Sequence, residues 1–504
     1  MRMLTLALAA VLALAGAAAV QAQSGATLTI SQPADATTMD PGRSTQVLTV
    51  NYFVNLYDTL TRWDASLKLV PGLATAWKNV NDTTWEFTLR SGVKFHDGTP
   101  VTAEDVKAVL ERNLIPGKTV VTAGFATIEA VQIPAPGTIR IVSKKPDPLV
   151  PVRMAQMGAQ IYPARFATDE GAKELARKPI GSGAYRFVEW VKDDRLVMDA
   201  NRDWWGWEGK APVFTRVVWK PIPDDFARLS ALQRNEVDIV TNVPPDQMKT
   251  VRTVTVPSSR YVALQANVTQ PPLSDKRVRQ ALHYALDVQS IVKNLYAGQG
   301  KPFSGGLADT DFGFNPALKP YPHDPERARR LLAEAGYPNG IDVTIYAGAG
   351  TMVNDKQLLE AIADMWSRVG IRARVEMMEM AQRQKMLNER ATPPNAMLLV
   401  NPQSTLLDAD GVLWRIYHPN GFAGKYWIGS QPGQRFHDVM ERARYTLDPK
   451  KRRELYMEAT RIIHEEKPFV ELFQEVVIYG VGKSIALKPR PDYRIIVSEI
   501  GLDR

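Results

Sequence analysis

The sequence of 504 residues contains no cysteine, which excludes disulfide bonds, thiolate metal ligands and a lipid anchor on an amino-terminal cysteine. Its six histidines show no paired ligand spacing, so we expect no bound metal. Neither a Gly-x-Ser-x-Gly elbow nor a Gly-Lys-Ser/Thr phosphate loop is present. We therefore expect no cofactor, no catalytic residue and no enzymatic activity.

A concentrated basic surface is also missing, although the formal net charge is +8. Lysines and arginines are scattered along the chain, and no basic stretch is interleaved with stacking aromatic residues. Nucleic acid is therefore not an expected partner. The length exceeds what one hydrophobic core supports, so two or three domains are expected.

Long apolar runs are absent after the amino terminus, where a secretory signal is present. A basic start at residues 1–3 precedes an apolar core at residues 4–15, and Val20-Gln21-Ala22 fits the small-residue cleavage rule. The apolar core is shorter than the ~20 residues that a membrane span needs. We predict cleavage after residue 22 and, without a cysteine to lipidate, a soluble periplasmic protein.

The most informative stretch is residues 69–113. Trp85, Phe87 and Leu89 alternate with polar residues, as in a half-buried strand, and residues 93–95 are predicted to form a second short strand. Thr102 and Asp105 have the spacing of a capping box, so a helix is expected to begin at Ala103.

These residues resemble the signature of family 5 solute-binding proteins of ABC importers, the dipeptide, oligopeptide and nickel-binding group. The resemblance covers Leu73-Ala74, Trp77 and residues 87–106. A second matching segment, at residues 271–287, contains Arg277-Val278-Arg279-Gln280-Ala281 followed by Tyr284-Ala285-Leu286-Asp287. The family's "Y–D–x–L" segment and its Gly-Ser-Gly turn have counterparts at residues 57–60 and 181–183.

The resemblance implies an α/β fold of the type II periplasmic binding protein class, with two α/β lobes and an additional small α+β domain inserted in the first lobe. Alternating strand and helix patterns, such as a strand at 342–346, a helix at 355–369 and a strand at 372–376, agree with it. The predicted division is a signal peptide at 1–22, lobe I at 23–61, 182–265 and 476–504, the inserted domain at 62–181, and lobe II at 266–475.

For ligand chemistry the resemblance indicates residues 396–417. Peptide-binding members carry an aspartate-rich loop here, from which a carboxylate binds the peptide's amino terminus, and Asp408 and Asp410 occupy that place, with Trp414 in the same segment. A carboxylate in a closed cleft would hold an ammonium group by charge-assisted hydrogen bonds. Alternatively, both aspartates only cap a helix at residues 411–417.

The segment around Thr351 departs from the family pattern. Relatives often carry an arginine nearby that binds a ligand carboxylate, and Thr351 supplies no charge. A dipeptide with a free carboxylate is expected only if Arg383 or Lys385 takes that role. Nickel is not expected, for the reasons given for metals in general.

The function implied is that of a periplasmic receptor. It would capture a small solute, a peptide or peptide-like molecule, between its lobes and deliver it as a monomer to ABC permease subunits in the inner membrane. A non-peptide solute (an opine, a glutathione-like molecule or a sugar) is the alternative within this role. A secreted hydrolase or a chaperone on the same fold is the alternative from another class.

Overall fold

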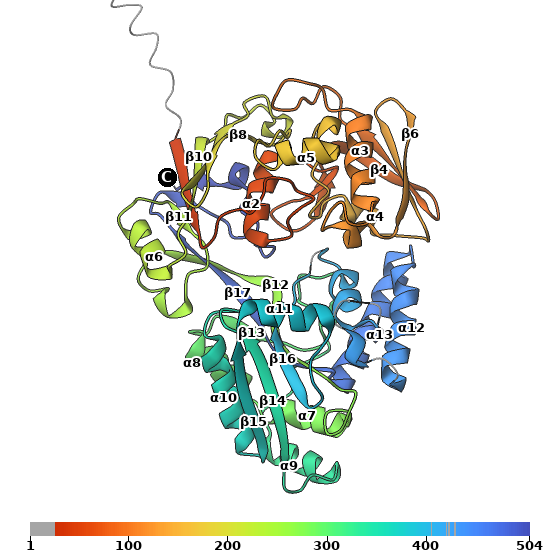
Figure 1. The fold of residues 1–504 in the computed structure, drawn as a ribbon, viewed down its shortest axis with the longest axis vertical. Coiled ribbons are helices and arrows are strands. Elements are labelled where there is room, and N and C mark those ends of the chain that lie inside the picture. Colours follow the sequence, from red (N-terminus) through yellow and green to blue (C-terminus); the bar gives the residue numbers. More distant parts are fainter. Residues whose placement is uncertain (1–25, 405, 420, 422–423, 428–429, 504) are drawn as a thin grey trace, which may run out of the picture.

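The computed structural model describes residues 26–404, 406–419, 421, 424–427 and 430–503, and their main feature is an 11-stranded sheet that extends through two lobes (Figure 1). The signal peptide predicted at residues 1–22 lies outside the described residues. In order across the sheet the strands are β15 (Ile371–Met378), β14 (Ile341–Gly348), β16 (Ala396–Val400), β12 (Thr253–Ala266), β17 (Phe469–Val481), β11 (Ile239–Val240), β1 (Ala26–Gln32), β10 (Phe214–Pro221), β9 (Arg195–Ala200) and β8 (Tyr185–Val191), with β13 (Gly300–Pro302) beside β17.

Two long antiparallel strands, β12 and β17, connect the lobes. Their pairing shifts register between Pro257 and Tyr261, at a proline that has no backbone N–H to donate. Val254 and Val256 pack on the core of lobe I, whereas Tyr261 belongs to the core of lobe II. Each strand therefore crosses from one lobe into the other.

Lobe I contains β1 and its parallel neighbours β10 and β11, together with β8 and β9. Helix α2 (Val47–Leu56) follows β1, and α6 (Asp225–Gln233) lies between β10 and β11. Asn235, two residues after the end of α6, has a left-handed backbone conformation, with φ of 58°.

The inserted domain has a separate four-stranded sheet (Figure 1). Its strands and helices are β2 (Thr61–Trp63), β3 (Leu69–Pro71), β4 (Ala74–Asn81), β5 (Thr84–Leu89), α3 (Ala103–Leu114), β6 (Ile128–Ala135), β7 (Thr138–Ser143), α4 (Val150–Arg153) and α5 (Asp169–Leu175). The capping box at the start of α3 is confirmed, because Thr102 accepts from the amide of Asp105 and Asp105 accepts from that of Thr102. Its apolar residues share one core with lobe I.

The strand predicted at residues 93–95 is wrong. Only one bridge, between Lys94 and Pro100, forms there. The amide of Phe95 donates to Thr99 and that of Val101 donates to Val93, so the turn at Asp97 closes a loop too short for a ladder.

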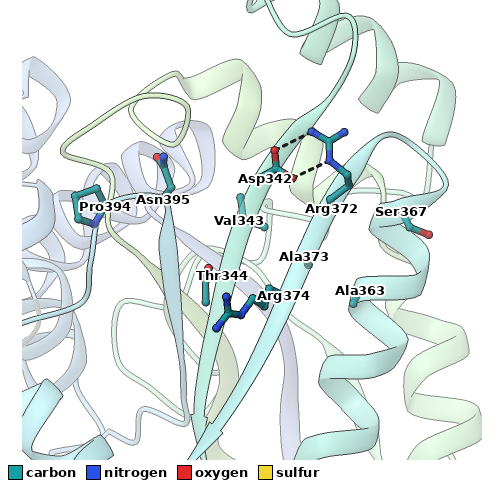
Figure 2. Close-up of a pocket in the computed structure, with 10 residues that line it drawn as sticks. All are labelled: Asp342, Val343, Thr344, Ala363, Ser367, Arg372, Ala373, Arg374, Pro394 and Asn395. Carbon is teal, nitrogen blue, oxygen red and sulfur yellow. Dashed lines mark hydrogen bonds and ion pairs between the residues drawn. The ribbon is translucent and has the colours of Figure 1, made fainter.

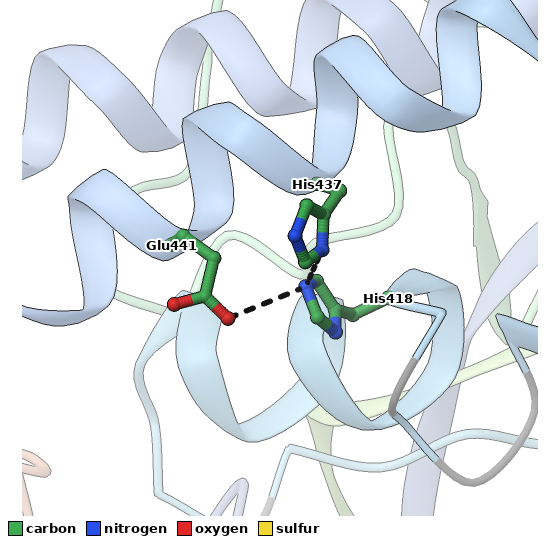
Figure 3. Close-up of side chains that lie close together, drawn as sticks. All are labelled: His418, His437 and Glu441. Atoms are coloured by element: carbon green, nitrogen blue, oxygen red, sulfur yellow. Dashed lines mark hydrogen bonds and ion pairs between the residues drawn. The ribbon is translucent and has the colours of Figure 1, made fainter.

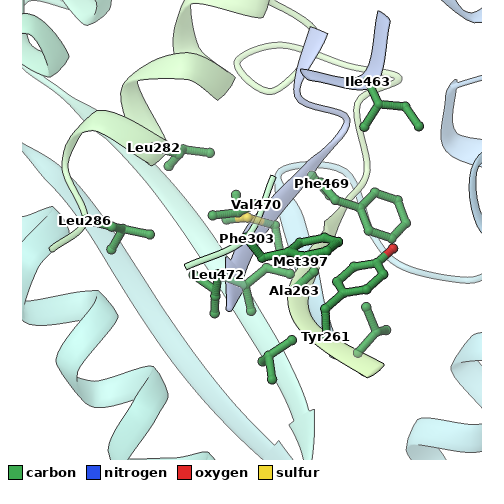
Figure 4. Close-up of a cluster of buried hydrophobic side chains, with 14 of the residues drawn as sticks. Tyr261, Ala263, Leu282, Leu286, Phe303, Met397, Ile463, Phe469, Val470 and Leu472 are labelled. Carbon is green, nitrogen blue, oxygen red and sulfur yellow. The ribbon is translucent and has the colours of Figure 1, made fainter. Parts of the chain in front are cut away.

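Lobe II combines the parallel strands β14, β15 and β16 with a set of helices. They are α7 (Lys276–Tyr284), α8 (Val288–Leu295), α9 (Pro325–Glu334), α10 (Asp355–Ser367), α11 (Met380–Glu389), the π-helix η6 (Asp410–Tyr417), α12 (Gln431–Arg444) and α13 (Pro449–Glu466). The rings of Tyr261 and Phe303 stack with centroids 4.2 Å apart in the lobe II core (Figure 4). The residues predicted as a helix at 411–417 are helical, but with the wider π geometry.

The apolar residues Ile495, Ile496 and Val497 predict a strand at 494–497, but no strand forms there. The amides of Ile495 and Val497 donate to the side chains of Asn51 and Asn55 on α2 rather than to a neighbouring strand. The last paired segments are β18 (Ile485–Ala486) and β19 (Gly501–Leu502). Ile485, Ile495 and Val497 nevertheless pack in the same core as β1 and β10. The division of the chain into lobes and an inserted domain stays a prediction. No helix in the described ranges has the length and apolar character of a membrane span.

Candidate functional site

A small cavity lies between the two lobes. Val47, Trp63 and Met157 line it from lobe I and the inserted domain, and Gln403, Ser404 and Leu407 line it from lobe II. Gln403 and Ser404 follow β16, so they extend from the carboxyl end of a parallel strand, where α/β folds place their ligands. The cavity volume is about 40 Å³. That is room for about one or two water molecules, so a solute enters only after the lobes separate.

The lobes touch directly beside this cavity. Trp63 and Ala155 form one buried apolar cluster with Leu407 of lobe II. The ammonium group of Lys145 lies 4.7 Å from the ring centroid of Tyr445, at the end of α12. The inserted domain therefore contributes much of the surface on which lobe II closes, as Figure 1 shows for α4 and α12.

A buried ion-pair network crosses the same interface. Arg153, at the end of α4, donates from Nε to Asp147 Oδ2 at 2.9 Å and from Nη2 to Asp410 Oδ2 at 3.4 Å. Arg444 Nε lies 3.5 Å from the other oxygen of Asp410. Burial favours the protonated form of Asp147, yet the charge of Arg153 and the hydrogen bonds to that carboxylate hold its pKa below the ordinary value. Asp410 is thus neutralised from both lobes.

Asp408 has an arginine of its own lobe as its partner. Arg452 Nη1 on α13 lies 2.9 Å from Asp408 Oδ2, and both side chains are buried. The guanidinium also stacks at 4.5 Å over Phe312. Burial raises the pKa of Asp408, and Arg452 opposes that rise. Both aspartates predicted as ammonium anchors therefore already face a cation of the protein.

Asp311 is an equally buried carboxylate without such a partner. Its exposed fraction is 4%, and neither carboxylate oxygen makes a hydrogen bond within the described part of the chain. The hydroxyl of Ser404 lies beside it and favours its charged form, which partly opposes the effect of burial. Burial, with the nearby charge of Asp408, raises the pKa of Asp311 to about 7. Because Ser404 lines the interlobe cavity, a buried carboxyl group without a cationic partner among the described residues lies beside one wall of that cavity.

Thr351 and Arg383 lie at the same edge of the lobe II sheet as Ser404. Thr351 follows β14, where its hydroxyl donates to the carbonyl of Gly348 at 2.7 Å. Arg383, on α11, donates from Nη2 to the carbonyl of Leu399 at 3.1 Å, while its Nε has no hydrogen-bond partner in the described residues. Burial lowers the pKa of Arg383. Neither residue lines the closed cavity.

Trp414 does not line the interlobe cavity. Its ring stacks on His418 at 3.5 Å, and the guanidinium of Arg444 lies 3.9 Å above it. The structure thus brings Trp414 close to Asp410 through Arg444.

A larger hollow lies elsewhere on the described surface. It is a groove of about 610 Å³ over β14 and β15, and one of its two arginines, Arg372, is already held by both oxygens of Asp342 (Figure 2). The groove lies on one lobe only, so closure of the lobes does not enclose it. The interlobe cavity is therefore the candidate site, despite its smaller volume.

Sequence reasoning missed three residues of this site. Asp311 and Ser404 lie in irregular segments without a motif, and Arg153 lies in the inserted domain, 257 positions from Asp410. The only signal in the sequence was the density of aspartates at Asp309 and Asp311.

Comparison with known proteins agrees with this arrangement. The "ABC transporter-associated periplasmic binding protein DppA" of Helicobacter pylori, solved with the peptide STSA, is 24% identical with a TM-score of 0.78, covering 95% of this chain and 98% of its own. The substrate-binding protein CtaP of Listeria monocytogenes is 20% identical with a TM-score of 0.85, covering 95% and 99%. The fold is that of the type II periplasmic binding proteins, as predicted.

The sequence model of the bacterial extracellular solute-binding proteins, family 5, matches residues 68–424. The chain belongs to this family. Among curated proteins, the glutathione-binding protein GsiB of Salmonella typhi is 28% identical over 468 residues, which cover 89% of each chain. Membership confirms the predicted role of a solute-binding protein, and the family is one of binding proteins.

Proposed function

We propose that this protein is the periplasmic receptor of an ABC importer for a peptide or peptide-like solute with a free amino group. The solute binds between the lobes, leaves chemically unchanged and passes to the permease from the closed, monomeric receptor. A secretory signal at residues 1–22 and the absence of a cysteine for lipidation would make it soluble in the periplasm. The peptide or glutathione class is suggested by the relatives.

The observation that carries this proposal is the unpaired carboxylate of Asp311 behind Ser404. A buried charge without a partner is costly, and an ammonium group in the cavity wall would supply the missing cation. Arg494 lines the same cavity from lobe I, so a solute with an amine and a carboxylate would contact both lobes only when they are closed. Such a solute shifts the equilibrium towards closure.

The residues predicted from the sequence take different roles in this proposal. Asp408 and Asp410, each held by arginine, shape the site and its closure rather than bind the ammonium. Trp414 supports Arg444 from behind. Thr351 and Arg383 remain candidates for contacts with the far end of a longer solute.

The test is a binding screen of the mature protein, stripped of solute by unfolding and refolding. We would titrate glutathione, short peptides and their N-acetylated forms by calorimetry, with opines and oligosaccharides as further arms, and identify the released solute by mass spectrometry. Blocking the amine should weaken binding about 10- to 100-fold, because a charge-assisted hydrogen bond contributes about 1.5–3 kcal/mol.

Two variants locate the anchor. Asp311→Asn should lose the preference for the free amine, whereas Asp438→Asn, at an exposed aspartate on α12, should keep it. If Asp408→Asn alone abolishes that preference, the anchor is Asp408 and the assignment to Asp311 is wrong. Binding of non-peptide solutes only, or chemical turnover of the solute, would overturn the proposed substrate class or the receptor role respectively.

A further inference from the structure

Three side chains with metal-ligating atoms meet between η6 and α12, away from the interlobe cavity. His418 follows the last residue of η6, and His437 and Glu441 lie one turn apart on α12. Figure 3 shows the three side chains pointing toward one another across the gap between the two helices. One ligand atom from each lies within 4.8 Å of the others.

The geometry of the two imidazoles is unusual for a packed core. Nδ1 of His437 lies 2.5 Å from Nε2 of His418, and the nearer carboxylate oxygen of Glu441 lies 3.9 Å from that same Nε2. Two neutral rings at this distance share one proton in an N–H···N hydrogen bond, and a metal ion that replaces this proton would be bound by the lone pairs of both nitrogens.

We propose that His418, His437 and Glu441 form a binding site for a divalent transition-metal ion, with Zn²⁺ as the natural probe, and that the ion joins η6 to α12. Two imidazoles and one carboxylate are a common protein donor set for zinc, with ligand bonds of about 2.0–2.2 Å. Tetrahedral ligation requires the two nitrogens to separate to about 3.3 Å, a movement of under about 1 Å.

The surroundings of the three ligands favour binding of a metal ion. His418 is fully buried and its ring is fixed by stacking on Trp414 at 3.5 Å, while the side chain of Glu441 is 30% exposed, which leaves solvent access to the fourth coordination position. Arg444, the nearest cation, has its charge offset by Asp410. The ion would therefore neutralise Glu441 without competing for the network that closes the lobes.

The site is separate from the one proposed for the solute. None of its three ligands lines the interlobe cavity, and all three belong to lobe II. Its function would be to fix α12, which carries Arg444 towards the lobe interface, against η6, which carries Asp410.

The experiment uses the mature, tag-free protein after treatment with a chelator. Zn²⁺ is titrated in competition with a chromophoric chelator, and thermal unfolding is followed with and without the ion. We expect one equivalent to bind to the wild type and to raise the melting temperature by about 2 °C or more, reversibly with EDTA. His437→Ala and Glu441→Gln should each weaken binding at least about tenfold.

The matched control is His323→Ala, at an exposed histidine of lobe II outside the cluster, which should bind Zn²⁺ as the wild type does. Only six histidines occur in the chain, so binding at other imidazoles contributes little background. If His437→Ala does not fold without metal, Glu441→Gln, at a partly exposed position, decides the question. Failure of the wild type to retain one equivalent, or equal affinity of Glu441→Gln and His323→Ala, would overturn the proposal.

Discussion

Asp410 and Asp311 are both buried in lobe II, each with an exposed fraction of 4%, yet their surroundings are opposite. Asp410 lies between Arg153 of the inserted domain and Arg444 of its own lobe. Asp311 has no hydrogen-bond partner on either oxygen among the described residues. A paired buried carboxylate is part of the architecture, because removing its partner is costly; an unpaired one retains its capacity to bind a cation from outside.

The largest expected effect comes from breaking the paired region. Arg153→Met leaves Asp147 and Asp410 buried without their shared cation, so the free energy of unfolding should fall by about 3–5 kcal/mol. The urea midpoint, at constant slope, measures the change. A loss below about 1 kcal/mol would mean that the network is hydrated and contributes as little as a surface pair.

The next prediction concerns Asp311→Asn, which should produce a gain in stability rather than a loss, and the gain should depend on pH. The raised pKa of Asp311, about 7, means that the folded protein binds this proton more tightly than the unfolded chain does. The wild type should therefore lose stability as pH rises from about 4 to about 7, by at most about 4 kcal/mol from this group. Asp311→Asn has no carboxylate to ionise at this position. Its free energy of unfolding should therefore rise relative to that of the wild type across this pH range.

Thermal unfolding of both proteins between pH 4 and pH 8 tests this prediction, with Asp438→Asn as the exposed control. If the difference in melting temperature between Asp311→Asn and the wild type does not change with pH, the charge of the Asp311 carboxylate is already balanced by other groups of the protein. A variant that is more stable at pH 8 and has lost its preference for free amines would connect the unpaired charge to binding.

A smaller effect is expected from the other end of the paired network. Asp410→Asn removes one carboxylate but leaves Arg153 with Asp147, so the loss of stability should be about 1–2 kcal/mol. The double variant with Arg153→Met should lose less than the sum of the single losses, because the two side chains interact directly. Additive losses in the urea midpoints would show that the contact at 3.4 Å is not energetically coupled.

The smallest effect is expected for an exposed ion pair, which serves as the reference for the buried network. Arg216 and Asp199 pair across β9 and β10 with side chains that are 50% and 37% exposed. Arg216→Met should change the free energy of unfolding by less than about 1 kcal/mol, because water screens the pair and solvates either partner alone. A loss as large as that of Arg153→Met would show that burial does not set the difference between the networks.

Local rules were enough for much of the fold. The capping box of Thr102 and Asp105 placed the start of α3, since this signal acts within one helical turn. The two incorrect strands have a common cause. Residues 93–95 lacked the length for a ladder, and the backbone at 495 and 497 bonded to two asparagines of α2 more than 440 positions away in the chain.

The candidate site was predictable only in outline. The segment containing Asp408 and Asp410 does lie next to the cleft, but their arginine partners come from α13, α12 and α4. The histidine cluster was missed for a similar reason, because His418 and His437 are 19 positions apart and no spacing rule connects them.

By itself, the sequence determined the family resemblance, the order of helices and strands, and the absence of thiol chemistry, because these follow from residue type and from neighbours within a few positions. Only the tertiary structure decided which buried carboxylates are paired, which one faces the cavity wall alone, and which histidines meet. Charge pairing depends on distance in space and on exclusion of water, and chain folding sets both between residues hundreds of positions apart.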